Sequence, residues 1–283
     1  MEIVGIILLA ILVILSALYL FMVWPGRRRK DLQESFLGKW YAHRGYHDNK
    51  TEAPENSLAA FRKAVDRGFG IELDVQLTKD EQVVVFHDND LKRVCGVDAP
   101  VNSKTFEELQ ELSLLNSNQK IPLFTDVLEV VDGKVPLIVE IKMVDSRTRV
   151  CELANDILKD YKGQYCVESF HPFAVKWFKE NRPELMRGQL SSNFKKDGDK
   201  ENFTAWLVHM LMSNMSCRPD FIAYCHEYTS NISFRLCTKL LGALPVAWTI
   251  KSEEQLLRAE NKYKVFIFEG FDPEKVEGFG GRK

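Results

Sequence analysis

The stretch Phe69-Gly-Ile-Glu-Leu-Asp-Val-Gln-Leu77 decides the fold of this chain. It reads as a β-strand in which Glu72 and Asp74 are two residues apart, so both side chains point to one face while Leu73 and Val75 point to the other. Two carboxylates on one interior face repel each other, and their burial adds a desolvation cost. A cation between them removes both costs. The stretch therefore predicts a buried strand that carries a charged site.

Apolar runs of similar length recur on both sides of this strand. Most are continuous rather than alternating, which is typical of strands covered on both faces. The further candidate strands are Trp40–Ala42, Val83–Phe86, Leu137–Ile141, Tyr165–Phe170, Met186–Leu190, Phe221–Tyr224, Val246–Ile250 and Val265–Phe268.

Helix signals separate these runs. Ser57 opens a stretch with helical spacing of apolar residues, and Gly68 ends it. The segments Thr105-Phe-Glu-Glu108 and Ser252-Glu-Glu-Gln255 have the pattern of capping boxes. Repeated alternation of strand and helix over about 250 residues predicts an α/β fold, a single (β/α)8 TIM barrel. A doubly wound open sheet is the alternative.

Nine candidate strands are one too many for such a barrel. The connection Thr78–Glu81 is too short for a crossover helix, so Ile71–Leu77 and Gln82–His87 are predicted to form an antiparallel hairpin. Pairing of Leu77 with Gln82 would place His87 opposite Glu72.

The N-terminus predicts a membrane anchor. Ile3–Trp24 contains no charged residue and is long enough to cross the ~30 Å hydrocarbon core as one helix. A cleaved signal peptide is the alternative, but it would need a basic start and a shorter apolar stretch. The basic cluster Arg27–Lys30 follows the run, which predicts a single-pass protein of the cell membrane with a cytoplasmic C-terminal domain. The expected parts are the helix and basic cluster (1–30), a linker (31–39) and one barrel domain (40–283).

Charge and cysteine content narrow the class of protein. The net charge is −2, and residues 31–283 hold 34 basic and 39 acidic residues, so this domain is a poor candidate for nucleic-acid binding. The six cysteines show no paired spacing and fit reduced thiols in a cytoplasmic domain.

A third carboxylate completes a candidate metal site. Glu140 lies near the end of the apolar strand Leu137–Ile141 and is expected beside Glu72 and Asp74. An all-carboxylate site of this kind suits Mg²⁺ or Ca²⁺. The alternative is that the acids form salt bridges with Arg44 and Lys142.

Two histidines and the same two cations extend this inventory. Histidine titrates near neutral pH, so His43 and His87 on opposite sides of a phosphate are candidates for general base and general acid. Arg44 and Lys142 are candidates for binding the nonbridging phosphate oxygens. Either histidine alone would more simply be structural. Together these groups indicate phosphodiester chemistry.

Several ordered segments resemble the glycerophosphodiester phosphodiesterase family. They are His43-Arg44-Gly45, Pro54-Glu55-Asn56-Ser57, Glu72-Leu-Asp-Val-Gln-Leu-Thr-Lys-Asp80, Val85-Phe86-His87-Asp88, Ile121-Pro122-Leu123, Glu140-Ile141-Lys142 and Glu168-Ser169-Phe170. The resemblance implies a TIM barrel, a divalent metal at Glu72, Asp74 and Glu140, catalysis by His43 and His87, and phosphate binding by Arg44 and Lys142. The implied reaction cleaves a glycerophosphodiester to glycerol 3-phosphate and an alcohol.

The chain also departs from that family. A Thr-Asp turn is common near the family's C-terminus, and Ile267–Phe271 stands here instead. Trp248 resembles the aromatic residue that would form a wall for the glycerol or alcohol group, and packing in the core is the alternative role. Glu168 is expected to be structural. Phe203–Met215 is apolar around most of a helix and is either a barrel helix or a surface that leans on the bilayer and admits lipids.

Three functional classes remain open at this stage. The first is hydrolysis of soluble glycerophosphodiesters. The second is lysophospholipase D or phospholipase C-like cleavage of membrane lipids, and the third is a non-catalytic lipid-binding domain.

Overall fold

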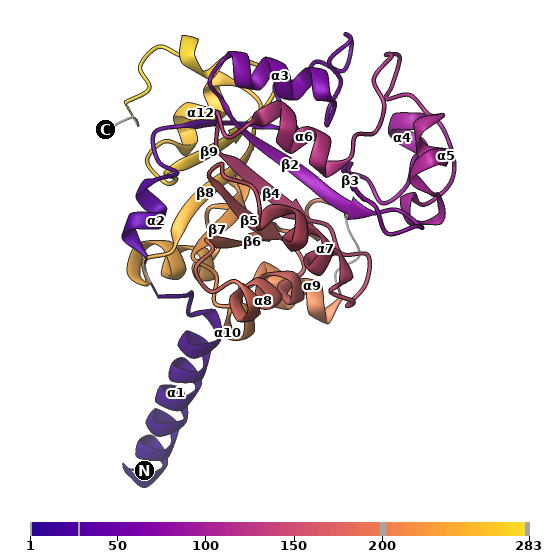
Figure 1. Ribbon diagram of the computed structural model, residues 1–283. Coiled ribbons are helices and arrows are strands. Elements are labelled where there is room, and N and C mark those ends of the chain that lie inside the picture. The colour runs from indigo at the N-terminus through magenta and orange to yellow at the C-terminus, as the bar shows by residue number, and fades with distance from the viewer. Residues whose placement is uncertain (1, 28, 199–201, 281–283) are drawn as a thin grey trace.

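The computed structural model describes residues 2–27, 29–198 and 202–280 (Figure 1). Its center is a barrel of eight parallel strands, closed because β1 pairs with both β2 and β9. The strands are β1 (Trp40–His43), β2 (Gly70–Leu77), β4 (Leu137–Ile141), β5 (Tyr165–Ser169), β6 (Arg187–Ser191), β7 (Phe221–Cys225), β8 (Leu244–Ile250) and β9 (Val265–Phe268). The closed barrel confirms the predicted TIM barrel and excludes the open sheet.

The ninth strand, β3 (Val83–Val85), pairs antiparallel with β2, as the short connection predicts. The predicted register was wrong by one residue, because Leu77 pairs with Val83 rather than Gln82. The cause is a five-residue loop in which Thr78 Oγ1 accepts the Gln82 N–H at 2.9 Å and Glu81 has a φ of 59°. His87 therefore does not lie opposite Glu72 in this pairing.

Helices surround the barrel and cover the outer face of the strands (Figure 1). The longer ones are α3 (Leu58–Asp66), α6 (Phe124–Val131), α7 (Arg149–Leu158), α8 (Pro172–Asn181), α9 (Phe203–His209) and α12 (Glu253–Ala259). The shorter helical segments are α4 (Lys92–Cys95), η1 (Val101–Ser103), α5 (Phe106–Gln110), α10 (Asn214–Cys217), η2 (His226–Tyr228), α11 (Ile232–Arg235), η3 (Leu236–Leu240) and η4 (Pro273–Lys275).

The capping signals agree with the structure in one case and differ in detail in another. Thr105 and Glu108 form the predicted reciprocal box at the start of α5. Ser252 accepts a hydrogen bond from the Gln255 N–H, but the Gln255 side chain accepts from the N–H of Lys251 instead of Ser252. The single helix expected over Phe203–Met215 is instead α9 and α10, because Leu211 has a φ of 54°, outside the helical region.

The barrel interior is filled by side chains. Gly188 on β6 leaves the space that the ring of Phe221 on β7 occupies, since a Cβ at position 188 would lie 2.0 Å from that ring. The interior is therefore a packed core. Open space for a ligand lies at the carboxyl ends of the strands.

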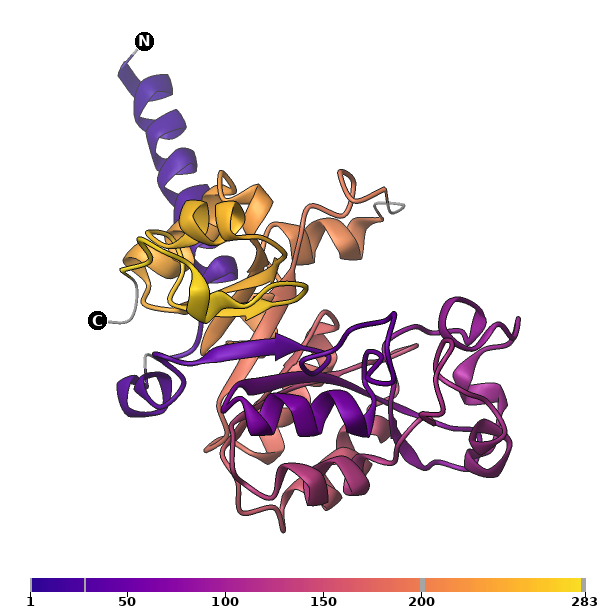
Figure 2. The same cartoon turned by 90° about the horizontal axis from the view of Figure 1, so that it is seen from above.

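The N-terminal segment is one long helix that projects from the barrel, α1 (Glu2–Val23), and a short one, α2 (Lys30–Glu34) (Figures 1 and 2). Residues 31–39, expected as a linker, pack on the barrel: Gln33 and Phe36 are buried. Arg29, from the basic cluster, binds Asp220 rather than pointing only to solvent.

Candidate active site

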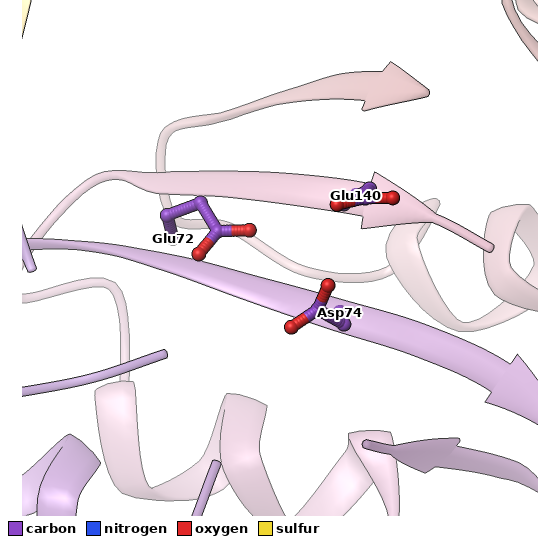
Figure 3. A group of neighbouring side chains, drawn as sticks. All are labelled: Glu72, Asp74 and Glu140. Atoms are coloured by element: carbon purple, nitrogen blue, oxygen red, sulfur yellow. The ribbon is translucent and has the colours of Figure 1, made fainter. Parts of the chain in front are cut away.

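Three carboxylates meet where β2 and β4 lie side by side. Asp74 pairs with Glu140 in the parallel register, and Glu72 is two residues earlier on β2, so all three point into the barrel mouth (Figure 3). Each offers an oxygen, and these oxygens lie within 4.8 Å of one another. All three residues are buried. The structure thus brings together the three predicted metal ligands.

This crowding shifts the pKa values of the three carboxylates in different directions. Burial and the neighboring Asp74 and Glu140 charges raise the pKa of Glu72 well above its usual value. Burial also raises the pKa of Glu140. Burial acts against ionization of Asp74 too, but the charges of His87, Lys142 and Arg44 hold its pKa low. Asp74 Oδ1 is buried without a hydrogen-bond partner. These are the properties of a site that a cation would stabilize.

The two predicted phosphate-binding cations flank this group. Lys142 Nζ lies 3.1 Å from Glu140 Oε1 and 3.6 Å from Asp74 Oδ1. Arg44 Nη1 is 2.7 Å from Glu55 Oε1, and its Nε is 3.8 Å from Asp74 Oδ2. The salt bridges considered as the alternative to a metal are therefore present, yet among the described residues no lysine or arginine side chain lies within ion-pair distance of Glu72.

Each candidate catalytic histidine is held by a carboxylate. His43 Nδ1 is 2.5 Å from Glu269 Oε2, which leaves Nε2 on the side of Glu72, 3.9 Å from Oε2. His87 Nδ1 is 2.6 Å from Asp88 Oδ1. Burial and the Arg44 charge lower the pKa of His43 to about 4, although the bond to Glu269 opposes this shift. His43 is thus neutral at pH 7, with Nε2 free to accept a proton.

Two cavities open beside these groups. One, of about 450 Å³, is lined by His43, Arg44, Glu72 and Trp248 among others. The other, of about 600 Å³, contacts Lys142 and extends toward α9. They share the lining residues His87, Glu140 and Phe170. The ring of Trp248 stands edge-on to Phe170 at 5.4 Å, so Trp248 forms part of a cavity wall and also packs.

Comparison with known proteins identifies the family. The model of the glycerophosphoryl diester phosphodiesterase family matches residues 43–216, which include every group described above except Trp248 and Glu269. The chain belongs to this family. It is 33% identical over 161 residues to a glycerophosphodiester phosphodiesterase of Bacillus altitudinis, covering 53% of this chain and 64% of that protein. It is 30% identical over 179 residues to human lysophospholipase D GDPD1, covering 58% of this chain and 55% of that protein. The chain thus spans less than two thirds of the length of these relatives.

Solved structures of the family share the barrel. A glycerophosphodiester phosphodiesterase from Thermotoga maritima superposes with a TM-score of 0.62 at 27% identity, covering 81% of this chain and 93% of that one. A phosphodiesterase from Oleispira antarctica, solved with the product sn-glycerol-3-phosphate, gives a TM-score of 0.67 at 24% identity, covering 83% and 94%. The second likeness shows the fold alone.

The structure adds to the candidate site residues that sequence reasoning missed. Glu269 follows β9, in the segment where this chain departs from the family's Thr-Asp pattern, and the pairing of β9 with β1 brings it to His43. Glu55 binds Arg44, and Asn56 donates from Nδ2 to Asp74 Oδ2 at 3.0 Å. The Pro54–Ser57 motif was the available signal for the last two. Glu168, expected to be structural, lies beside Glu140 in the register and its Oε2 is buried without a hydrogen-bond partner.

Proposed function

We propose that this chain hydrolyzes glycerophosphodiesters to glycerol 3-phosphate and an alcohol with the help of a divalent metal. The observation that carries the proposal is the buried group of three carboxylates, Glu72, Asp74 and Glu140, beside two histidines that are each held by a carboxylate. Membership of the phosphodiesterase family and the names of the relatives support the same reaction class.

Glu72, Asp74 and Glu140 would hold the metal. Their oxygens, the lack of a hydrogen-bond partner for Asp74 Oδ1 and the raised pKa of Glu72 fit a hard cation with oxygen ligands, Mg²⁺ or Ca²⁺. The bound metal would neutralize the carboxylates and polarize the phosphate. Arg44 and Lys142 would bind nonbridging phosphate oxygens and offset the charge that develops in the transition state.

The histidines would move the protons. His43 Nε2 takes a proton from a water molecule while the water oxygen forms a bond to phosphorus. Glu269 holds Nδ1, the other nitrogen of the His43 ring. His87 gives a proton to the leaving alkoxide oxygen as the second phosphorus–oxygen bond breaks, and Asp88 orients its ring. The products are then a phosphomonoester and a free alcohol. Trp248, in the wall of the same cavity, would contact the glycerol or alcohol group.

The test is a panel of glycerophosphodiesters assayed by release of glycerol 3-phosphate, with Mg²⁺, with Ca²⁺ and with chelator. Glu72→Ala and His43→Ala are expected to lower kcat/KM by about a thousandfold or more, since they remove a metal ligand and the base. Glu129→Ala, an exposed acid on α6, is the matched control and should retain full activity. Titration calorimetry with each metal alone should show binding that Glu72→Ala weakens and His43→Ala preserves. Full activity in both site variants would end the proposal.

A second candidate activity is cleavage of lysophospholipids by the same site. It is favored by the 600 Å³ cavity, whose lining includes Met143, Phe170, Phe194 and Val208 beside the shared His87. Relatives named lysophospholipase D support it. Phosphorus NMR of the products from glycerophosphocholine and from lysophosphatidylcholine separates the two activities, and it also detects any cyclic phosphate formed by a phospholipase C-like cut.

The proposed location is a cell membrane, with α1 as a single span and the barrel on the cytoplasmic side. Ile3–Val23 is long and apolar enough to cross a bilayer, with a mean hydropathy of 3.1, though a signal sequence passes the same test. The buried Val23 at the end of α1 favors a retained anchor over a cleaved peptide. The proposed parts remain the anchor with its basic cluster (1–30), the packed connection (31–39) and the catalytic barrel (40–283).

A further inference from the structure

The last turn of α1 is seated in the barrel domain. Tyr19 Oη lies 2.7 Å from Ser233 Oγ of α11, and the Val23 carbonyl oxygen accepts from Asn214 Nδ2 at 2.9 Å. Arg218 Nη1 donates to the carbonyls of Phe21 and Trp24. The helix therefore leaves the domain at a fixed place, beside α10 (Figure 1) and in contact with α11.

The contacts of the α1 end with the barrel domain, made by Tyr19, Phe21, Val23 and Trp24, are called here the seat of α1. They leave only the part of the helix before Tyr19 free of the domain. Residues 3–18 are all exposed, and these 16 residues span only about 24 Å at roughly 1.5 Å per residue. The hydrocarbon core is about 30 Å thick. A bilayer that covers this helix must consequently reach the level of Tyr19, so the domain surface beside the seat lies among the lipid headgroups.

The contacts of α11 and η3 with α1 show which end of these helical segments is nearer to the bilayer. Ser233 contacts Tyr19, and Cys237, four residues later, donates to the carbonyl of Val23, four residues after Tyr19. α11 and η3 therefore run alongside the end of α1 in the same direction. Ile232, which is 61% exposed, is then at the bilayer end of α11.

A cationic cavity lies along this same helix. It has a volume of about 280 Å³ and is lined by three cations, two hydroxyls and one ring: Arg235, Lys239, Lys262, Thr229, Thr238 and Phe234. Within the described part of the chain, no acidic side chain lines it, and none of its three cations forms an ion pair. Lys262 Nζ donates to Thr229 Oγ1 at 3.2 Å, and this hydrogen bond holds two of the lining side chains together. Thr238 Oγ1 donates to the Phe234 carbonyl at 2.8 Å, so the donors left for a phosphate group are the three cations and the Thr229 hydroxyl.

We propose that this cavity binds the headgroup phosphate of an anionic phospholipid in the leaflet that meets the seat of α1. The short free span brings the headgroup layer to this side of the barrel, and the cavity supplies the charge to bind it. The site is separate from the barrel mouth, and the proposal does not depend on the phosphodiesterase activity.

The test uses the full chain in detergent and native mass spectrometry with dioctanoyl phosphatidylglycerol, dioctanoyl phosphatidylcholine or inorganic phosphate as probe. The wild type should retain phosphatidylglycerol in preference to the other two. The triple variant Arg235→Gln, Lys239→Gln, Lys262→Gln should bind it roughly tenfold to a hundredfold more weakly, since each cation contributes separately to attraction of the headgroup.

The matched control removes one arginine and two lysines elsewhere, in Arg62→Gln, Lys92→Gln, Lys134→Gln. These side chains are exposed on α3, on α4 and before β4, away from α1 (Figure 1). The control should bind like the wild type, and all three proteins should have similar unfolding midpoints. Equal binding by the triple variant and the wild type would overturn the proposal. Displacement of the lipid by inorganic phosphate at equal concentration would overturn the assignment to a lipid.

Discussion

Buried carboxylates lie at both ends of the barrel, and they differ in whether arginine side chains neutralize them. Asp220, near the amino ends of the strands, accepts from Arg29 Nε at 2.9 Å and from the Arg187 N–H at 3.0 Å. Glu72, at the carboxyl ends, accepts a single hydrogen bond within the described part of the chain, from the Arg44 N–H at 3.1 Å, and faces two further carboxylates. One end is satisfied by the chain's own donors. At the other end Glu72 has no lysine or arginine partner among the described residues and lies against Asp74 and Glu140, an arrangement that a bound cation would stabilize.

The largest expected effect is a difference in the free energy of unfolding between substitutions at the two ends of the barrel. Asp220→Asn removes the charge that Arg29 and Arg187 share and should cost about 3 kcal/mol or more, because it leaves the buried Arg187 and the partly buried Arg29 unpaired. Glu72→Gln should cost nothing, or stabilize, because it relieves repulsion. For a domain of this size the first change corresponds to a drop in unfolding midpoint of roughly 6–12 °C. Thermal unfolding in chelator measures both, and an equal drop in the two variants would remove the contrast.

Glu55 lies at the mouth of the barrel, as Glu72 does, but it is paired with arginine side chains, as Asp220 is. Its burial is outweighed by hydrogen bonds from Arg93 and by the charge of Arg44, which lower the pKa of Glu55 to about 2. The folded pKa is below the unfolded value, so the stabilization is complete above about pH 4.5 and is lost as pH falls toward 2.

Glu55→Gln should therefore remove about 2–3 kcal/mol of stability at pH 7 and little at pH 2. Unfolding midpoints followed from pH 7 to pH 2 give the measurement. Glu52→Gln, an exposed acid of the same loop, serves as control. A loss that is the same at every pH would mean that packing, rather than charge, is responsible.

Much of this architecture is predictable because it depends on local pattern. Continuous apolar runs gave the strands, and the two-residue spacing of Glu72 and Asp74 placed them on one face. The hairpin register failed because the turn depends on Glu81 adopting a left-handed backbone, which the sequence does not signal. Glu269 was missed because it meets His43 only when β9 closes the barrel against β1. Contacts made by closure have no local signature.

The contact between Glu269 and His43 gives the smallest expected effect and tests whether the reactive end is also organized by charge. Glu269→Gln keeps an oxygen near His43 Nδ1 but removes the negative charge that stabilizes the ring once it has accepted a proton. kcat should fall roughly tenfold to a hundredfold with KM within about twofold, because the residue acts through His43 and not on the substrate. Glu254→Gln, an exposed acid on α12, is the matched control.

A pH profile separates a positioning role from simple packing. Loss of the Glu269 charge withdraws the interaction that raises the pKa of His43, so the acid limb of the kcat profile should move to lower pH in Glu269→Gln. Glu269→Asp should recover part of the rate, since it restores the charge on a shorter side chain. A fall in kcat with an unmoved acid limb, and no recovery in Glu269→Asp, would assign Glu269 to packing.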